Sequence, residues 1–263
     1  MVNESADKAA PRWSRRAFLG LAISALQLKD PAERALRNPR LTARPDRPFR
    51  RVATGQTRIG EGLARGGYLF VPASYREEEP APLILALHGG GGDAGRWSAL
   101  HAICEQQGIV LAAPDSRGHT WDRVHGSFGP DVAFIDAVLR FSFERCSIDP
   151  TRIGLAGFSD GASYTLSLGP SNGDLFTHLM AWSPGFSNPE TPIVGRPRVF
   201  VSHGSEDGVL PVALSRSAIV PMFEMDGYDV TYREFVGRHE LTSEIIAQSF
   251  GWFLDDRQAH PQQ

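Results

Sequence analysis

The stretch that most limits what this chain can fold into is residues 153–164, IGLAGFSDGASY. Its apolar start is typical of a buried strand, and a helix-like segment follows it. Between them lies Gly157-Phe-Ser-Asp-Gly161, a Gly-x-Ser-x-Gly pattern in a strand–turn–helix context. The two glycines allow strand and helix to approach closely, and the turn predicts a strained backbone at Ser159. We expect the Ser159 hydroxyl above the carboxyl edge of a sheet, at a helix N-terminus.

Strands and helices alternate around this motif. Two short antiparallel strands are expected at residues 56–59 and 67–71, before a wholly apolar run at residues 82–87 that is typical of a central parallel strand. Further strands are expected at residues 109–113, 153–156, 178–183, 199–202 and 230–236, and helices at residues 97–107, 131–143, 212–225 and 241–254 and directly after the Ser159 turn. The order predicts the α/β class, with one doubly wound, mostly parallel sheet and an antiparallel start.

Composition excludes several other classes. The 263 residues suffice for one α/β domain, and 41% hydrophobic with 22% charged residues is usual for a soluble globular protein. A net charge of -3 gives no sign of a nucleic-acid partner. Cys104 and Cys146 are too few for a disulfide framework or a metal cluster. A bridge between them remains open, and two buried thiols are favoured.

The ends of the chain differ from its middle. Residues 14–19, SRRAFL, resemble a twin-arginine export motif, and the apolar run at residues 17–28 is shorter than the roughly 20 residues of a spanning helix. Residues 1–28 are therefore predicted to be a signal for export to the periplasm or beyond, without stable membrane insertion. A frayed amphipathic helix on a cytoplasmic protein is the alternative. Residues 29–53 are Arg- and Pro-rich and predicted to be a solvated linker, residues 54–255 the domain, and residues 256–263 a polar tail.

A serine nucleophile needs a base and an acid, and both are expected at strand ends. In the order Ser, Asp, His, the base follows Ser159, and four histidines do so: His178, His203, His239 and His260. His239 is preferred, because it stands just past the last expected strand. Asp207 is the preferred acid over Glu206, because Gly208 and Pro211 shape a turn after it.

The oxyanion hole should combine two backbone amides. One is that of Asp160, the residue after the nucleophile. The other is expected in the glycine run at residues 89–92, with Gly90 preferred and Gly89 and Gly91 as alternatives. A phosphate-binding loop is disfavoured, because no Gly-x-Gly-x-x-Gly and no Gly-Lys-Ser/Thr is present. The Asp160 side chain is assigned to the favourable field of the helix N-terminus.

Together these motifs resemble the α/β-hydrolase superfamily, closest to the phospholipase/carboxylesterase and polyhydroxybutyrate-depolymerase-like esterases, over residues 54–255. The resemblance rests on residues 88–91, 157–161 and 203–207 with Pro211 and His239. It implies a single-domain α/β-hydrolase fold and a serine esterase that forms an acyl-enzyme, without a cofactor. The chain departs from the pattern at Arg238, where relatives usually place glycine directly before the histidine. A thioesterase, a peptidase or a non-catalytic binding protein of this fold remain alternatives.

The substrate side is less constrained. The short segment at residues 183–199 leaves no room for a large lid and favours small-molecule esters with short to medium acyl or aryl groups. The expected pocket walls are Trp97, Trp121, Phe158, Trp182, Phe186 and Leu210. His119, Asp122 and His125 match no common ligand spacing, so no metal is expected. The oligomeric state is left open.

Overall fold

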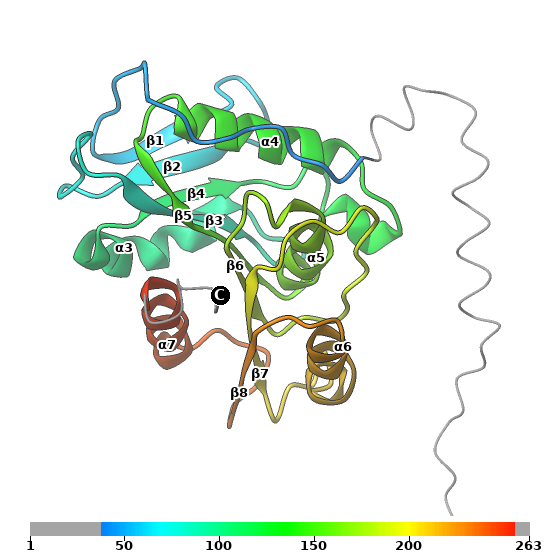
Figure 1. Cartoon of the computed structure of the whole chain (residues 1–263). Coiled ribbons are helices and arrows are strands. Elements are labelled where there is room, and N and C mark those ends of the chain that lie inside the picture. The colour runs from blue at the N-terminus through cyan, green and yellow to red at the C-terminus, as the bar shows by residue number, and fades with distance from the viewer. Residues whose placement is uncertain (1–37, 256–263) are drawn as a thin grey trace, which may run out of the picture. The chain divides into compact units, whose positions relative to one another are not determined.

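The structure, a computed structural model, describes residues 38–255, in which one eight-stranded sheet carries helices on both faces (Figure 1). The strand order is β1-β2-β4-β3-β5-β6-β7-β8. The first two strands pair antiparallel, and β2 pairs antiparallel with β4, whereas the remaining pairs are parallel. The strands are β1 (Gly55–Ile59), β2 (Gly67–Val71), β3 (Ala81–Leu87), β4 (Val110–Pro114), β5 (Ile148–Phe158), β6 (His178–Trp182), β7 (Arg198–Gly204) and β8 (Val230–Phe235). This confirms the predicted sheet with its antiparallel start.

Alternation along the central strands divides the core into two layers. In β3, Leu83, Leu85 and Leu87 join one apolar cluster, whereas Ile84 and Ala86 join the other. Helices α4, α5 and α6 supply the first cluster, and α3 and α7 supply the second. Their bounds are α3 (His101–Gln107), α4 (Pro130–Phe143), α5 (Asp160–Leu168), α6 (Val220–Met225) and α7 (Ser243–Leu254). Burial of the sheet on both faces explains why the central strands β3 and β4 are apolar throughout.

Two predicted helices differ from their expected form, and two short turns were not predicted. The helix expected at residues 97–107 is a 3₁₀ helix, η2 (Ala94–Leu100), followed by α3. The helix expected at residues 212–225 contains a π turn, η5 (Ser215–Ile219), before α6. Pro221 explains this interruption, because it has no N–H to donate to the preceding turn. A further short 3₁₀ turn, η3 (Asp122–His125), and another, η4 (Gly169–Asn172), were not predicted.

The turn after β5 has the geometry that its glycines predict. Ser159 adopts φ 57° and ψ -117°, a region that non-glycine residues rarely occupy. A Cβ on Gly157 would collide with the carbonyl oxygen of Gly161, and one on Gly161 would collide with that of Leu87. Both positions therefore require glycine, and the sharp turn places Ser159 between β5 and α5.

Residues 38–52 do not form the solvated tether expected from their arginines and prolines. They form no helix or strand, yet Leu41 and Ala43 are buried in the core. The Leu41 amide donates to Asn172 Oδ1 at 2.8 Å, and the Ala43 amide donates to Asp136 Oδ1 at 2.7 Å. Backbone groups without a sheet partner thus bond to side chains of the domain, and this part of the expected linker packs against the domain.

Other expectations concern the thiols and the ends of the chain. Cys104 and Cys146 are free and buried, and burial raises the pKa of each thiol to about 12. Between residues 38 and 255, no helix has the length and apolar character needed to cross a membrane. The predicted export signal and the polar tail lie outside the described residues.

Candidate active site

Three side chains from three loops form a hydrogen-bonded chain at the carboxyl edge of the sheet. Ser159 Oγ lies 2.9 Å from His239 Nε2, and His239 Nδ1 lies 2.6 Å from Asp207 Oδ2. Ser159 follows β5, Asp207 follows β7 and His239 follows β8. Because parallel strands end at the same edge, residues up to 80 positions apart meet there. These are the three residues that the sequence singled out.

The Asp207 carboxylate is held by several donors. Its Oδ1 accepts the amides of Val209 and Leu210, each at 2.8 Å, and its Oδ2 accepts from His239. Burial alone would raise the pKa of Asp207, but the hydrogen bonds from His239 and the two amides lower it overall. An ionised Asp207 accepts a hydrogen bond from the Nδ1–H of His239. The Nε2 atom is then free to accept the Ser159 hydroxyl proton.

A second histidine, His203, contacts the acid rather than the serine. It is fully buried, with Nε2 at 2.8 Å from Leu210 O and 3.3 Å from Asp207 Oδ2. Its Nδ1 lies 2.7 Å from Ser215 Oγ. Of the alternative bases, His203 thus supports the loop that carries Asp207. His178 lies at the start of β6 and packs edge-on against Trp252.

The loop after β3 is oriented by its own first residue, His88. This buried ring has Nδ1 at 2.8 Å from Gly89 O, and its Nε2 accepts the Ser116 amide at 3.0 Å. A carbonyl only accepts and an amide only donates, so the proton belongs on Nδ1. Burial and the nearby Arg65 guanidinium lower the pKa of His88, which keeps the ring neutral. Sequence reasoning missed this role, and the position directly before four glycines was the available signal.

His88 also determines where the next amide points. The Gly89 carbonyl accepts from His88 and from the Gly92 amide at 3.0 Å. In a trans peptide the C=O and N–H point in opposite directions, so the Gly90 amide is directed away from the His88 ring. Asp160 is the first residue of α5, and its amide is one of those that a helix leaves without an internal partner. The backbone therefore leaves both proposed oxyanion donors, the amides of Gly90 and Asp160, oriented so that a substrate oxygen could accept from them.

A cavity of about 320 Å³ lies beside this constellation. It contains two of the expected walls, Trp97 and Phe158, and the Phe158 ring lies 4.8 Å from the His239 ring. Its lining residues are His88, Gly89, Arg96, Trp97, Ala99, Leu100, Phe158, His239, Glu240, Leu241 and Ile246. The surface is thus apolar and aromatic, with one cation and one anion.

The other expected walls lie elsewhere. Trp121 and Trp182 have no exposed surface. Trp121 donates to His88 O at 2.7 Å from behind the glycine loop, and Trp182 packs on Trp97 with 5.7 Å between ring centroids. Their assignment as pocket walls is wrong, because fully buried rings support the site without reaching a substrate. Phe186 and Leu210 are half-buried and outside this cavity lining, and their role stays a prediction.

The polar side chains of the loop after β4 bond to the protein itself, as Asp122 does with Asp131. No group of His, Cys, Asp or Glu within residues 38–255 is arranged to hold a metal ion. Asp122 and Asp131 instead exchange hydrogen bonds, each accepting the backbone amide of the other at 2.9 and 2.7 Å. Burial and then the neighbouring Asp131 raise the pKa of Asp122 to about 6.

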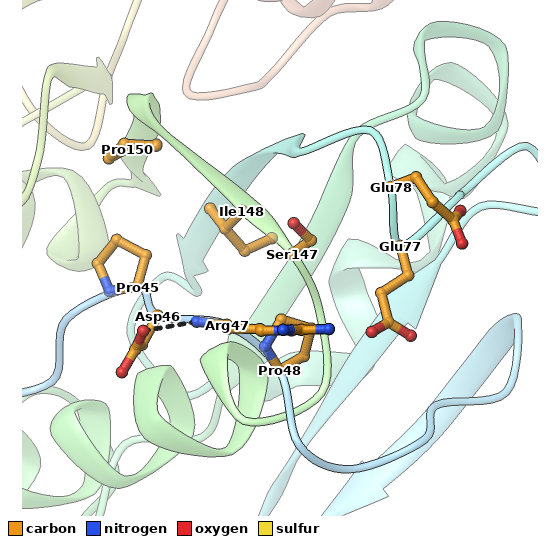
Figure 2. Close-up of a pocket in the computed structure, with 9 residues that line it drawn as sticks. All are labelled: Pro45, Asp46, Arg47, Pro48, Glu77, Glu78, Ser147, Ile148 and Pro150. Carbon is orange, nitrogen blue, oxygen red and sulfur yellow. Dashed lines mark hydrogen bonds between the residues drawn. The ribbon is translucent and has the colours of Figure 1, made fainter.

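A second cavity, of about 420 Å³, lies at the amino ends of β3 and β5, the sheet edge opposite Ser159 (Figure 2). Figure 2 shows residues 45–48 on one side, with Arg47 extending toward Glu77. The lining includes Ser147 but no histidine, so it lacks a base for a serine nucleophile. The chemistry is therefore assigned to the cavity beside His239.

Several curated proteins are similar to this chain in sequence. No protein-family model matches the chain. Feruloyl esterase B of Thermothelomyces thermophilus is 29% identical over 120 residues, covering 41% of this chain and 40% of that protein. A protein of Aspergillus oryzae named "Probable feruloyl esterase C" is 28% identical over 156 residues. The match covers 54% of this chain and 55% of that protein. The chain thus spans about half the length of the curated relatives it matches.

Solved structures agree on the fold. The crystal structure of esterase PE8 superposes with a TM-score of 0.60 at 22% sequence identity, covering 72% of this chain and 98% of that one. The structure of MGS-M1, an alpha/beta hydrolase enzyme from a deep-sea metagenome library, superposes with a TM-score of 0.57 at 20% identity, covering 76% of this chain and 96% of that one. Together with the strand order and the turn at Ser159, these similarities identify an α/β-hydrolase fold. The predicted fold class is therefore confirmed, and the two relatives and the solved structure PE8 carry esterase names.

Proposed function

We propose that the chain is a serine hydrolase that cleaves carboxylic esters through an acyl-enzyme, with Ser159, His239 and Asp207 as its catalytic triad. The single observation that carries the proposal is the hydrogen-bonded chain from Ser159 Oγ to His239 at 2.9 Å and on to Asp207 at 2.6 Å. An activated nucleophile needs a base within this reach and a third group that orients the base. The esterase names among the relatives support the same reaction class.

The mechanism follows from the atoms involved. Ser159 Oγ attacks the ester carbonyl carbon while His239 Nε2 takes its proton. Negative charge develops on the carbonyl oxygen, where the amides of Gly90 and Asp160 donate to it. His239 returns the proton to the departing alcohol oxygen, which leaves an acyl group on Ser159. Water then repeats the sequence, with His239 as its base, and releases the carboxylic acid.

The proposed substrates are small-molecule esters with a short acyl chain or an aryl group. The cavity of about 320 Å³ beside His239 has room for one such group, and Trp97 and Phe158 give it an aromatic surface. The two curated relatives described above carry feruloyl esterase names, which favours the aryl choice. Methyl ferulate and p-nitrophenyl butyrate are therefore the two esters to compare.

The test is hydrolysis of p-nitrophenyl acetate and butyrate by the wild type and Ser159→Ala. We expect the substitution to lower kcat by about 10³-fold or more, because no other hydroxyl occupies the turn. Ser74→Ala, at an exposed serine in the loop after β2, is the matched control and should retain full activity.

Each alternative has its own outcome. If Ser159→Ala and wild type are equally active, Ser159 is not the nucleophile. If neither hydrolyses any ester and no fluorophosphonate probe labels the wild type, the chain is a binding protein and the proposal fails. Faster turnover of thioesters or peptides than of esters in the same assay would move the activity to another hydrolase class.

A further inference from the structure

The carboxylate of Asp160 extends from the start of α5 toward the glycine loop after β3. Its Oδ2 accepts the Thr120 hydroxyl at 2.6 Å, and Thr120 is buried. The same oxygen lies 2.6 Å from the position that a Cβ on Gly90 would occupy. The side chain of one proposed oxyanion donor therefore contacts the residue that supplies the other. The sequence predicted only a favourable position in the field of the helix for this side chain.

The segment that holds Thr120 is bonded to the glycine loop through the residues on either side of it. His119 O accepts the Gly91 amide at 2.9 Å, and Trp121 Nε1 donates to His88 O at 2.7 Å. Thr120, between them, reaches across to Asp160. Because its neighbours are fixed on the loop, the Thr120 hydroxyl defines how far α5 stands from that loop.

From these contacts we infer that Thr120 and Asp160 form a positioning pair that sets the separation of the Gly90 and Asp160 amides. The inference rests on the proposed function, because it assigns a role in holding the oxyanion. A misplacement of about 1 Å in a catalytic group can cost on the order of 100-fold in rate. The Thr120 hydroxyl also donates to a carboxylate near the developing negative charge, which offsets part of their repulsion.

A purely structural role predicts something different. An acidic residue in a first helical turn stabilises the helix through the helix dipole, whatever Thr120 does. Loss of the Thr120 hydroxyl would then lower the melting temperature and leave turnover by the folded enzyme unchanged. A positioning role instead affects the transition state selectively.

The experiment measures kcat and KM for p-nitrophenyl butyrate, the inhibition constant of phenylboronic acid and the melting temperature. Boronic acids form a tetrahedral adduct with a serine nucleophile and so report the oxyanion hole directly. Thr120→Val should lower kcat about tenfold, weaken boronate binding by a similar factor, and leave KM within about twofold. Thr120→Ser, which keeps the hydroxyl, should recover most of both losses.

Thr165→Val is the matched control. Thr165 is fully buried in α5, and its hydroxyl has no hydrogen-bond partner within the described residues. The same substitution there removes a hydroxyl that positions nothing, so kcat and boronate binding should stay at the wild-type level.

Several results would overturn the inference. It fails if Thr120→Val leaves kcat and boronate binding intact at a temperature where the variant is folded. It also fails if Thr120→Ser behaves like Thr120→Val, or if Thr165→Val loses as much activity. A wild type that neither turns over esters nor binds the boronate refutes the proposed function and this inference together. Full loss in Ser159→Ala with no effect of Thr120→Val refutes the inference alone.

Discussion

Ser159 shows how tightly one residue can be specified by its neighbours. Its φ of 57° is strained for any side chain, and it persists because the surroundings leave the turn no alternative. A side chain at Gly157 would strike Gly161, and a side chain at Gly161 would strike the end of β3. The two positions that flank Ser159 in the motif therefore admit only glycine. This is why the motif could be recognised from the sequence.

The charged rim of the cavity carries a prediction at the same scale. The Arg96 guanidinium makes no hydrogen bond or ion pair within residues 38–255, and Glu240 lines the same cavity. Arg96→Gln should lower kcat/KM for 4-nitrophenyl hydrogen succinate relative to the neutral 4-nitrophenyl butyrate. Exposed charge pairs contribute about 0.2–1 kcal/mol, so the ratio should fall by about 1.5- to 5-fold.

Glu240→Gln supplies the opposite control. Removing this anion should raise the same succinate-to-butyrate ratio, and added salt should shrink both effects. If the two substitutions shift the ratio in the same direction, the ester does not enter through this rim.

At the scale of elements, residues 38–52 act as a strap that is held at two points. Leu41 enters the core, and its amide bonds to Asn172 at the end of η4, while residues 42 and 43 bond to Asp136 on α4. The strap thus joins two helices that are separate in sequence. Arg40 adds an ion pair with Asp174 at 2.8 Å, and its hydrogen bond lowers the pKa of Asp174 to about 2.

Leu41→Ala should lower the free energy of unfolding by about 2–4 kcal/mol, because it removes a buried side chain and leaves a cavity. Urea denaturation measures the change, and KM for esters should not move. Phe49→Ala is the control in the same strap, since that ring is 72% exposed and its loss should cost less than about 0.5 kcal/mol. Equal destabilisation by both would mean that the strap is not anchored at Leu41.

Prediction from the sequence succeeded for the elements whose residue pattern is compatible with a single local structure. Uninterrupted apolar runs marked the parallel strands, and glycines marked the turn at Ser159. It failed where polar composition concealed packing, as at Leu41, whose burial depends on side chains about 130 positions away. For the pocket, Trp97 and Trp182 look equivalent in sequence, and only their stacking order shows which one faces the cavity.

At the scale of the whole molecule, stability should depend on pH through Asp122. Its folded pKa of about 6 lies above the ordinary value of about 4, so the folded state favours the protonated form. The stability that this group contributes is present below about pH 4 and is lost as pH rises through about 6. Asp122→Asn mimics the protonated form. In this variant the melting temperature should depend less on pH between pH 4 and 7 than it does in the wild type.

At pH 7.5 the same variant should melt above wild type, by about 2–4 °C for each kcal/mol that ionisation of the carboxylate costs in a chain of this size. Glu61→Gln, at an exposed carboxylate, should leave the pH profile unchanged. A lower melting temperature for Asp122→Asn at pH 7.5 would show that the ionised carboxylate stabilises the loop instead.

The burial of both cysteines has a practical side. Alkylating reagents attack thiolates, and a buried thiol with a pKa of about 12 offers almost none at neutral pH. A cysteine introduced at Ala99, on the exposed margin of the cavity, would then be the single thiol in the chain that a maleimide dye can reach. A fluorophore attached there would report occupancy of the cavity in real time, with no native residue to block first.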